Sequence, residues 1–125
     1  MALQFENLVL GNSNMIIQKL NISFEDVVKD GPYFQRPKPS RGIKGCQIDY
    51  LIQSMPGVLY ACEIKFSRRK VSAGITREMQ TKIQNLTRPK GFAVIPVLIH
   101  INGVSESVIN SDLRFRIIDF GEMMK

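Results

Sequence analysis

The first part of the chain repeats apolar residues at the spacing of helices. The apolar side chains of this series are Phe5, Leu8, Val9, Ile16 and Leu20. Residues 11–14 are polar and interrupt it, so the pattern predicts either one helix with a weak middle or two short helices over residues 5–20. The glycine- and proline-containing residues 31–32 and 36–42 predict loops, with one edge strand between them at residues 33–35.

From residue 45 the pattern becomes that of strands. Residues 46–53 and 58–66 are rich in β-formers and are separated by the turn-like Met55-Pro56-Gly57, which predicts an antiparallel hairpin. Residues 92–101 form a nearly continuous apolar run, typical of a strand buried on both faces, with Pro96 at an edge or bulge. Residues 114–120 predict a last short strand.

Residues 71–86 predict a helix that presents one apolar face, made by Ile75, Met79, Ile83 and Leu86. The order of helix, hairpin, helix and strand indicates an α/β fold in which a mixed β-sheet is flanked by helices. A doubly wound sheet is not expected because the βαβ repetition is missing. At 125 residues the chain is expected to form a single domain over residues 1–125.

Charge is spread unevenly along the chain, whose formal net charge is +6. Residues 36–90 hold twelve Lys or Arg residues and three acids, a balance of +9, whereas the segments on either side are slightly acidic. A basic segment of this size is typical of a surface that binds a polyanion such as nucleic acid, and a merely solvated surface is the alternative. The three acids are Asp49, Glu63 and Glu78.

The sequence also predicts the compartment. No apolar run approaches the ~20 residues that span a bilayer, and the first ten residues do not resemble a secretory signal. We therefore expect no membrane association and a cytoplasmic location. Cys46 and Cys62 are expected to be free thiols in the core, on the sheet face opposite the acids and too far apart to form a disulfide.

Strand alternation places charged residues together. In residues 58–66, Glu63 and Lys65 point to one face, whereas Cys62, Ile64 and Phe66 point to the other and suit a core. Asp49 is expected opposite Glu63 across the hairpin, with Ile48, Tyr50 and Ile52 forming the apolar face of its strand. Cross-strand Cβ atoms lie about 4.5–5.5 Å apart, so two such carboxylates repel each other unless a cation or a proton lies between them.

Two interpretations of this acidic pair remain open. A divalent ion that prefers oxygen ligands, such as Mg²⁺, supplies the missing positive charge. Alternatively, Asp49 and Glu63 each pair with Lys65 or another base, without a metal.

The residues of the hairpin resemble a known signature. Its two parts are Gln47-Ile48-Asp49-Tyr50-Leu51-Ile52 and, after the turn, Cys62-Glu63-Ile64-Lys65-Phe66. They resemble the PD-(D/E)XK, or restriction-endonuclease-like, nuclease superfamily. More narrowly, the chain is similar to the nuclease-like domain at the C-terminus of certain prokaryotic AAA-type ATPases, in which a helix containing a Lys, here Lys82, and two further strands follow. The resemblance covers residues 5–124.

The resemblance implies a fold and roles. The fold is a restriction-endonuclease-like mixed sheet with an α-β-β-β-α-β core. Asp49, Glu63 and the carbonyl of Ile64 would hold Mg²⁺ or Mn²⁺, and Lys65 would orient the attacking water or neutralise the developing charge. Glu6 matches a helix-borne acid that completes the site in many members, although an exposed carboxylate favoured by the helix dipole is the other reading.

The sequence departs from the family pattern in two respects. Ile48 stands where the motif often has proline, and the phosphate-binding loop of an ATPase is missing from the chain. If the narrower resemblance holds, the chain is an excised C-terminal domain or a free-standing relative.

Two basic runs border the expected site and predict contacts with a nucleic-acid backbone, which position the molecule without reading its sequence. They are expected at the same end of the site and, with the helical lysine, comprise Arg36, Lys38, Arg41, Lys44, Arg68, Arg69, Lys70 and Lys82. His100, the only histidine, is expected to be a satisfied residue at a strand end rather than a ligand.

The sequence thus predicts a Mg²⁺-dependent nuclease that hydrolyses phosphodiester bonds of DNA. The alternative is a catalytically inactive module that binds nucleic acid or a partner and acts with an AAA-type ATPase. A component of a toxin–antitoxin or defence system is a third interpretation. The oligomeric state stays open, and a dimer is compatible with the sequence.

Overall fold

The computed structural model describes residues 2–67 and 69–124. Its five strands are β1 (Val27–Gln35), β2 (Cys46–Ser54), β3 (Val58–Lys65), β4 (Ala93–His100) and β5 (Arg116–Asp119). Its helices are α1 (Ala2–Gly11), α2 (Ser13–Lys19), α3 (Gly74–Asn85), α4 (Glu106–Ile109) and α5 (Phe120–Met123), with short 3₁₀ turns η1 (Phe24–Asp26) and η2 (Pro39–Arg41). The chain is therefore a mixed α/β protein, as expected.

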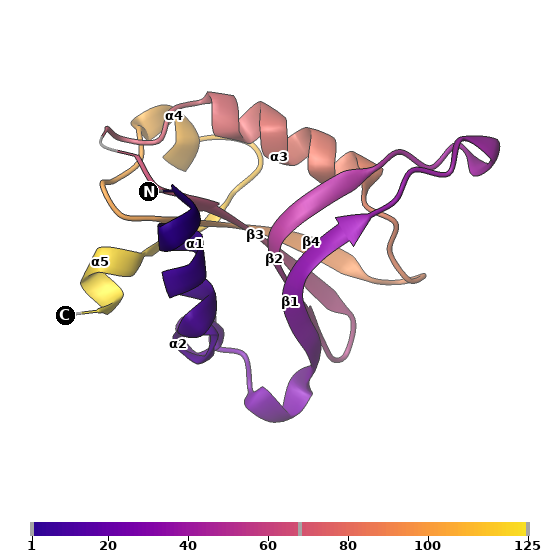
Figure 1. Ribbon diagram of the computed structural model, residues 1–125, viewed down its shortest axis with the longest axis horizontal. Coiled ribbons are helices and arrows are strands. Elements are labelled where there is room, and N and C mark those ends of the chain that lie inside the picture. Colours follow the sequence, from indigo (N-terminus) through magenta and orange to yellow (C-terminus); the bar gives the residue numbers. More distant parts are fainter. Residues whose placement is uncertain (1, 68, 125) are drawn as a thin grey trace.

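The five strands form one sheet in sequence order, β1-β2-β3-β4-β5 (Figure 1). β1, β2 and β3 pair antiparallel, whereas β3 with β4 and β4 with β5 pair parallel. The parallel connection between β3 and β4 is made by α3, as a parallel crossover requires. The prediction of a mixed sheet flanked by helices is thus confirmed.

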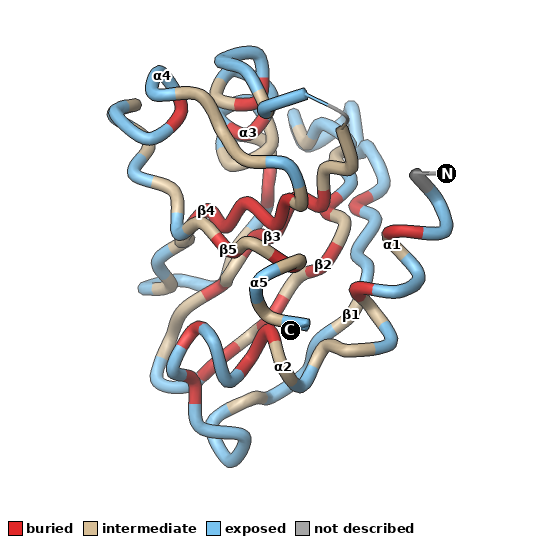
Figure 2. Tube along the Cα trace, turned by 90° about the vertical axis from the view of Figure 1, so that its left-hand side faces the viewer, coloured by how far each residue is buried: buried red, intermediate tan, exposed pale blue. Residues whose placement is uncertain are grey.

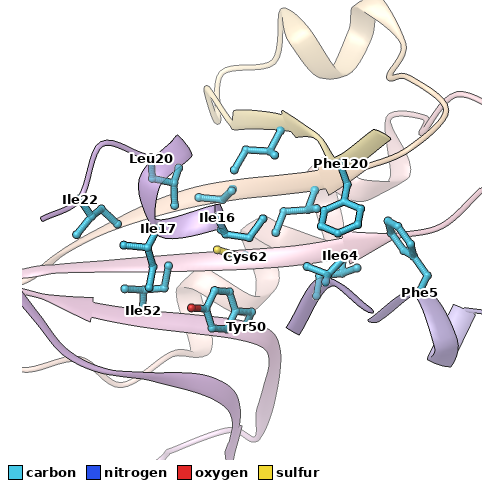
Figure 3. Packing of buried hydrophobic residues seen from close by; sticks show 14 residues of the cluster. Phe5, Ile16, Ile17, Leu20, Ile22, Tyr50, Ile52, Cys62, Ile64 and Phe120 are labelled. Atoms are coloured by element: carbon cyan, nitrogen blue, oxygen red, sulfur yellow. The ribbon is translucent and has the colours of Figure 1, made fainter. Parts of the chain in front are cut away.

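The helices cover both faces of this sheet (Figures 1 and 2). α1, α2 and α5 pack on one face over a large apolar cluster that includes Phe5, Ile64 and Phe120 (Figure 3). α3 and α4 lie on the other face, over two smaller clusters built around Met79 and Val108. β4 contributes to both faces, since Val97 and Ile99 belong to the first cluster and Leu98 to the last.

Most predicted elements are present. The first helical segment forms two short helices, which is one of the two alternatives, and the helix and strands of residues 58–120 appear within a few residues of their expected bounds. Pro96 lies just before the stretch of β4 that pairs with β5, Val97 to His100, which is a local edge as expected. The loop predicted at residues 31–32 is wrong, because β1 runs through Gly31 and Pro32 at an irregular point of its pairing.

This irregularity changes which face of the sheet the first side chains of β2 point to. Gly31 pairs with Leu51 and Tyr33 with Ile48, so two steps along β1 match three along β2. An extra residue in one strand reverses the alternation of side chains beyond it. Ile48 accordingly packs with Met79 beneath α3, whereas Tyr50 and Ile52 join the cluster beneath α1 and α2.

The single apolar face predicted for Ile48, Tyr50 and Ile52 is therefore wrong at Ile48. The same reversal affects Cys46, because alternation places it on the same face as Ile48, two residues further along the strand. In agreement, the charge of Lys82 on α3 acts on the pKa of the Cys46 thiol. Only Cys62 lies on the face expected for both cysteines. Both thiols are free, as expected.

Candidate functional site

The predicted charged face of β3 is present and lies beneath α3. Cys62 and Ile64 are buried in the apolar cluster on the opposite face, and Phe66 packs against that cluster. Glu63 is completely buried, and Lys65, at the strand end, is half-buried. Both side chains contact charged residues of α3. Period-two alternation in β3 thus separates a core face from a charged face within one strand.

Asp49 and Glu63 lie beside each other on neighbouring strands. The hairpin register is the predicted one from Tyr50 opposite Cys62 to Ser54 opposite Val58, and this strand pairing ends one residue before Asp49. The backbone N–H of Asp49 donates to Oε2 of Glu63 at 3.3 Å, and the N–H of Ile64 donates to Oδ2 of Asp49 at 2.9 Å. Each carboxylate is therefore tied to the backbone of the strand that carries the other, which fixes both orientations.

α3 supplies the positive charge that faces Glu63. The Lys82 ammonium donates a hydrogen bond to Oε1 of Glu63 and lies 3.8 Å from Oε1 of Glu78. Lys65 Nζ pairs with that same Glu78 oxygen at 3.1 Å. Of the two interpretations of the acidic pair, pairing with a base is thus observed for Glu63, and the base is Lys82 rather than Lys65.

Burial shapes the ionisation of this cluster. Desolvation and the negative charge of Asp49 raise the pKa of Glu63 to about 7, although Lys82 opposes the shift. Desolvation alone would lower the pKa of Lys82, but its bond to Glu63 and the charges of Glu63, Asp49 and Glu78 raise it. The positive charge of Lys82 thus partly offsets the buried charge of Glu63.

Glu6 reaches the site from α1, on the other side of the sheet from α3. Its side chain is partly buried, and its pKa is raised by desolvation, by the charge of Asp49 and by a side-chain hydrogen bond with Asp49. The charges of Lys65 and Lys82 act on it in the opposite sense. This position differs from the alternative of an exposed first-turn carboxylate, since α1 has no acid in its first turn.

The donor atoms suit a hard cation, although a complete cage is not preformed. Within residues 2–67 and 69–124, no three His, Cys, Asp or Glu side chains are grouped so that they could hold a metal ion. Mg²⁺ usually binds through one or two carboxylates and keeps several waters. Asp49 and Glu63 are two carboxylates of this kind fixed side by side, and both oxygens of Glu63 already accept hydrogen bonds, from the Asp49 N–H and from the Lys82 ammonium.

The two predicted basic runs lie near opposite ends of α3. The side chain of Gln35, beside the first run, donates to the carbonyl of Asn85 at the helix C-terminus, whereas Arg69 and Lys70 precede the helix N-terminus at Gly74. Twelve helical residues separate these ends by about 18 Å. The runs therefore do not border the same end of the site (Figure 1).

The other predicted backbone-binding residues are placed as follows. Residues Arg36, Lys38, Arg41, Lys44, Arg69 and Lys70 are exposed, and Arg68 lies outside the described residues. Lys82 is only 20% exposed and is engaged with Glu63. Their contacts with nucleic acid stay predictions.

Glu78 is the site residue that sequence reasoning missed. It links Lys65 and Lys82 and stands four residues before Lys82 on the same helix face. A signal was present, because Glu78 is one of only three acids in the basic segment and forms an i,i+4 pair with Lys82. The rotation of the helix against the sheet, which aims this pair at β3, is not readable from the spacing.

His100 behaves as predicted. Its side chain is buried, and its Nδ1 accepts a hydrogen bond from the N–H of Gly103 at 3.0 Å. Desolvation lowers the pKa of this imidazole, against the charge of Asp119. His100 is thus a neutral, satisfied residue at the end of β4.

No helix among the described residues is both long and apolar enough to cross a bilayer. In comparisons with known proteins, no protein-family model and no curated protein sequence matches the chain.

Proposed function

We propose that the protein is a Mg²⁺-dependent phosphodiesterase acting on DNA, with a PD-(D/E)XK-type site on a restriction-endonuclease-like sheet. The observation that carries the proposal is that Asp49 and Glu63 lie side by side, joined by hydrogen bonds between β2 and β3. Lys65 shares the charged face of β3 with Glu63, and the charge of Asp49 acts on Glu6 of α1. These four positions are spread along the sequence, and the family resemblance assigns a role to each of them.

Each residue of the site would have a separate role in phosphodiester hydrolysis. Asp49, Glu63 and the Ile64 carbonyl would hold Mg²⁺, which when bound polarises a phosphate and lowers the pKa of a bound water. Lys65, half-buried at the end of β3, orients the attacking water or neutralises charge that develops on the phosphate. Glu78 restrains the Lys65 ammonium on the side of α3. Lys82 offsets the charge of Glu63 until a cation takes that role.

A cleavage assay tests this proposal. The protein is incubated with supercoiled plasmid and with single-stranded DNA, in Mg²⁺, in Mn²⁺ and in EDTA. Metal-dependent cleavage that falls about 100-fold or more in Lys65→Ala is expected, because one electrostatic stabiliser of the transition state is lost. Lys19→Ala, which removes an exposed lysine of α2, is the matched control and should cleave like the wild type.

Two results would contradict the proposal. One is the absence of cleavage by the wild type at high protein concentration in either metal. The other is equal cleavage by the wild type and Lys65→Ala, which would identify a contaminating nuclease.

A second candidate function has its own supporting observation. The Lys82 ammonium already compensates Glu63, so the buried carboxylate is stable without any metal. An inactive module that binds nucleic acid, or that binds an AAA-type ATPase, is compatible with this pairing. It predicts salt-sensitive DNA binding or ATPase binding with no Mn²⁺ bound in calorimetric titration, whereas the nuclease proposal predicts Mn²⁺ binding that Asp49→Asn abolishes.

A further inference from the structure

The paired ends of β1 and β2 extend away from the body of the protein as an arm, which we define as residues 33–45 (Figure 1). The arm carries η2 at its tip and is exposed along most of its length. A protruding two-stranded arm has little core of its own to stabilise it. Its side chains are therefore available for contacts with something outside the chain.

A groove with a volume of about 390 Å³ runs along this arm. Besides Gln35, it is lined by two aromatic, two basic and two smaller side chains: Tyr33, Phe34, Arg36, Lys38, Ile43 and Thr87. Phe34 is 63% exposed and Tyr33 is 36% exposed, although both rings are large enough to gain from burial. Such a ring, lying in a groove beside basic side chains, is available to stack against a flat ligand.

Hydrogen bonds of Gln35 fix the backbone beneath this groove. Its buried amide donates to the carbonyls of Lys44 and Asn85 at 2.8 and 2.7 Å, and its Oε1 accepts from the N–H of Thr87 at 2.8 Å. These bonds join β1, the arm and the segment after α3. The aromatic and basic side chains are thus held on a prearranged backbone, which lowers the entropic cost of binding.

The positive charge of the arm favours an anionic ligand. Between Asp30 and Asp49 the sequence contains no acid, and the four bases of this stretch are all exposed: Arg36, Lys38, Arg41 and Lys44. Aromatic faces beside a positively charged groove are the features with which proteins bind single-stranded nucleic acid, since bases stack on the rings and phosphates meet the cations. A duplex hides its base faces and gains nothing from an exposed ring.

We propose that this groove is a binding subsite for an unpaired nucleic-acid strand, with a base stacked on Phe34 and the phosphates facing Arg36 and Lys38. This proposal rests on the proposed function in one respect, because it names the form of substrate that the same site would receive. Gln35 pairs with Cys46, which lies three residues, or about 10 Å, along β2 from Asp49. A strand held in the groove could therefore extend to the charged cluster.

Binding in EDTA tests the groove without any cleavage. Fluorescence anisotropy is measured with labelled single-stranded DNA, with RNA of the same sequence and with the corresponding DNA duplex. Phe34→Ala should weaken binding of the preferred single strand by fivefold or more, the loss expected for one stacked base. Phe24→Ala is the matched control, since Phe24 is 51% exposed on η1, outside the groove, and should change binding less than twofold.

The charge contribution is measured through salt dependence. Arg36→Ala with Lys38→Ala should make the negative slope of log K against log salt shallower by about 0.7 for each phosphate that these two side chains neutralise, whereas Lys19→Ala should leave it unchanged. A comparison of DNA with RNA identifies the preferred polymer, and weaker binding of either one by Phe34→Ala supports the proposal.

Three results would overturn it: no binding of any single strand, equal affinity for duplex and single strand, or equal effects of Phe34→Ala and Phe24→Ala. Cleavage in Mg²⁺ is scored separately. If the wild type binds single strands in the groove but does not cleave DNA, only the proposed nuclease activity is contradicted. If the wild type cleaves DNA but does not bind single strands in the groove, only the proposed binding subsite is contradicted.

Discussion

The two faces of the sheet bury different chemistry. Beneath α1 and α2 the strands meet an apolar cluster to which fourteen of the described residues contribute buried side chains. Beneath α3 the apolar clusters have three buried residues each, and the space beside them holds Glu63, fully buried, with Lys82. β3 contributes to both faces through alternate residues, so one strand serves the core and the charged cluster at once.

This difference indicates where stability and activity are located. Burial of apolar surface stabilises without any partner, whereas a buried ion pair has to offset the desolvation of two charges. The α1 face should therefore determine the free energy of unfolding. The α3 face retains charges that a solely structural layer would do without, and these are the charges on which the proposed chemistry depends.

The largest stability effect is expected on the apolar face. Phe120 is 1% exposed and packs edge-on against Phe5 with ring centroids 5.6 Å apart. Phe120→Ala should lower the free energy of unfolding by about 3–5 kcal/mol, because it leaves a cavity in the main core. Urea denaturation measures this loss, with the exposed Phe24→Ala as a control that should change it by about 0.5 kcal/mol or less. Similar losses in both variants would contradict the assignment of the core.

The next effect comes from leaving Glu63 without its cation. Lys82→Met should cost about 2–4 kcal/mol at pH 8, since a buried carboxylate then lacks its partner. Adding Glu63→Gln to this variant should recover at least half of the loss, because the orphaned charge is removed. Urea denaturation of the single and double variants, with Lys19→Met as the exposed control, checks this. A double variant less stable than Lys82→Met would show that the pair is not coupled as described.

A smaller effect is expected in the pH dependence. The pKa of Glu63 is raised from 4.5 to about 7, so in this window the folded carboxyl binds more proton than the unfolded one. Its contribution to the free energy of unfolding therefore falls as the pH rises from 4.5 to 7, by about 1–3 kcal/mol. Glu63→Gln has no titrating carboxyl at this position and lacks this pH-dependent contribution to the free energy of unfolding. Urea denaturation in EDTA at pH 5 and pH 8 should show a steeper fall for the wild type, and parallel profiles would count against it.

The smallest stability effect is expected for the residue with the largest proposed role. The Lys65–Glu78 pair is 33% and 42% exposed, and exposed pairs of this kind contribute about 0–1 kcal/mol. Lys65→Ala should thus unfold within about 1 kcal/mol of the wild type while losing cleavage. A large loss of stability would make Lys65 a structural residue and would remove the distinction between the two faces.

Local rules predicted the part of this arrangement that depends on one strand or one hairpin. Glu63 and Lys65 share a face because alternation is a property of any strand, and Asp49 meets Glu63 because a short turn fixes the register. Ile48 and Cys46 were placed on the wrong face because the extra residue in β2 is defined by its pairing with β1. No pattern within residues 46–53 encodes that shift.

The contacts made by α3 depend on tertiary packing. The helix and its apolar face were predicted, but the pairing of Lys82 with Glu63 and of Glu78 with Lys65 follows from how the helix lies across the sheet. The separation of the two basic runs has the same origin, because their distance along the sequence does not reveal that α3 lies between them.

Diffraction from crystals soaked in Mn²⁺ shows whether the acidic pair of Asp49 and Glu63 holds a divalent cation. We expect an anomalous peak within coordination distance of the Asp49 and Glu63 carboxylates, with the Lys82 ammonium withdrawn from Glu63. Crystals saturated with Mn²⁺ that show no peak beside Asp49, and Lys82 still bound to Glu63, would contradict this expectation.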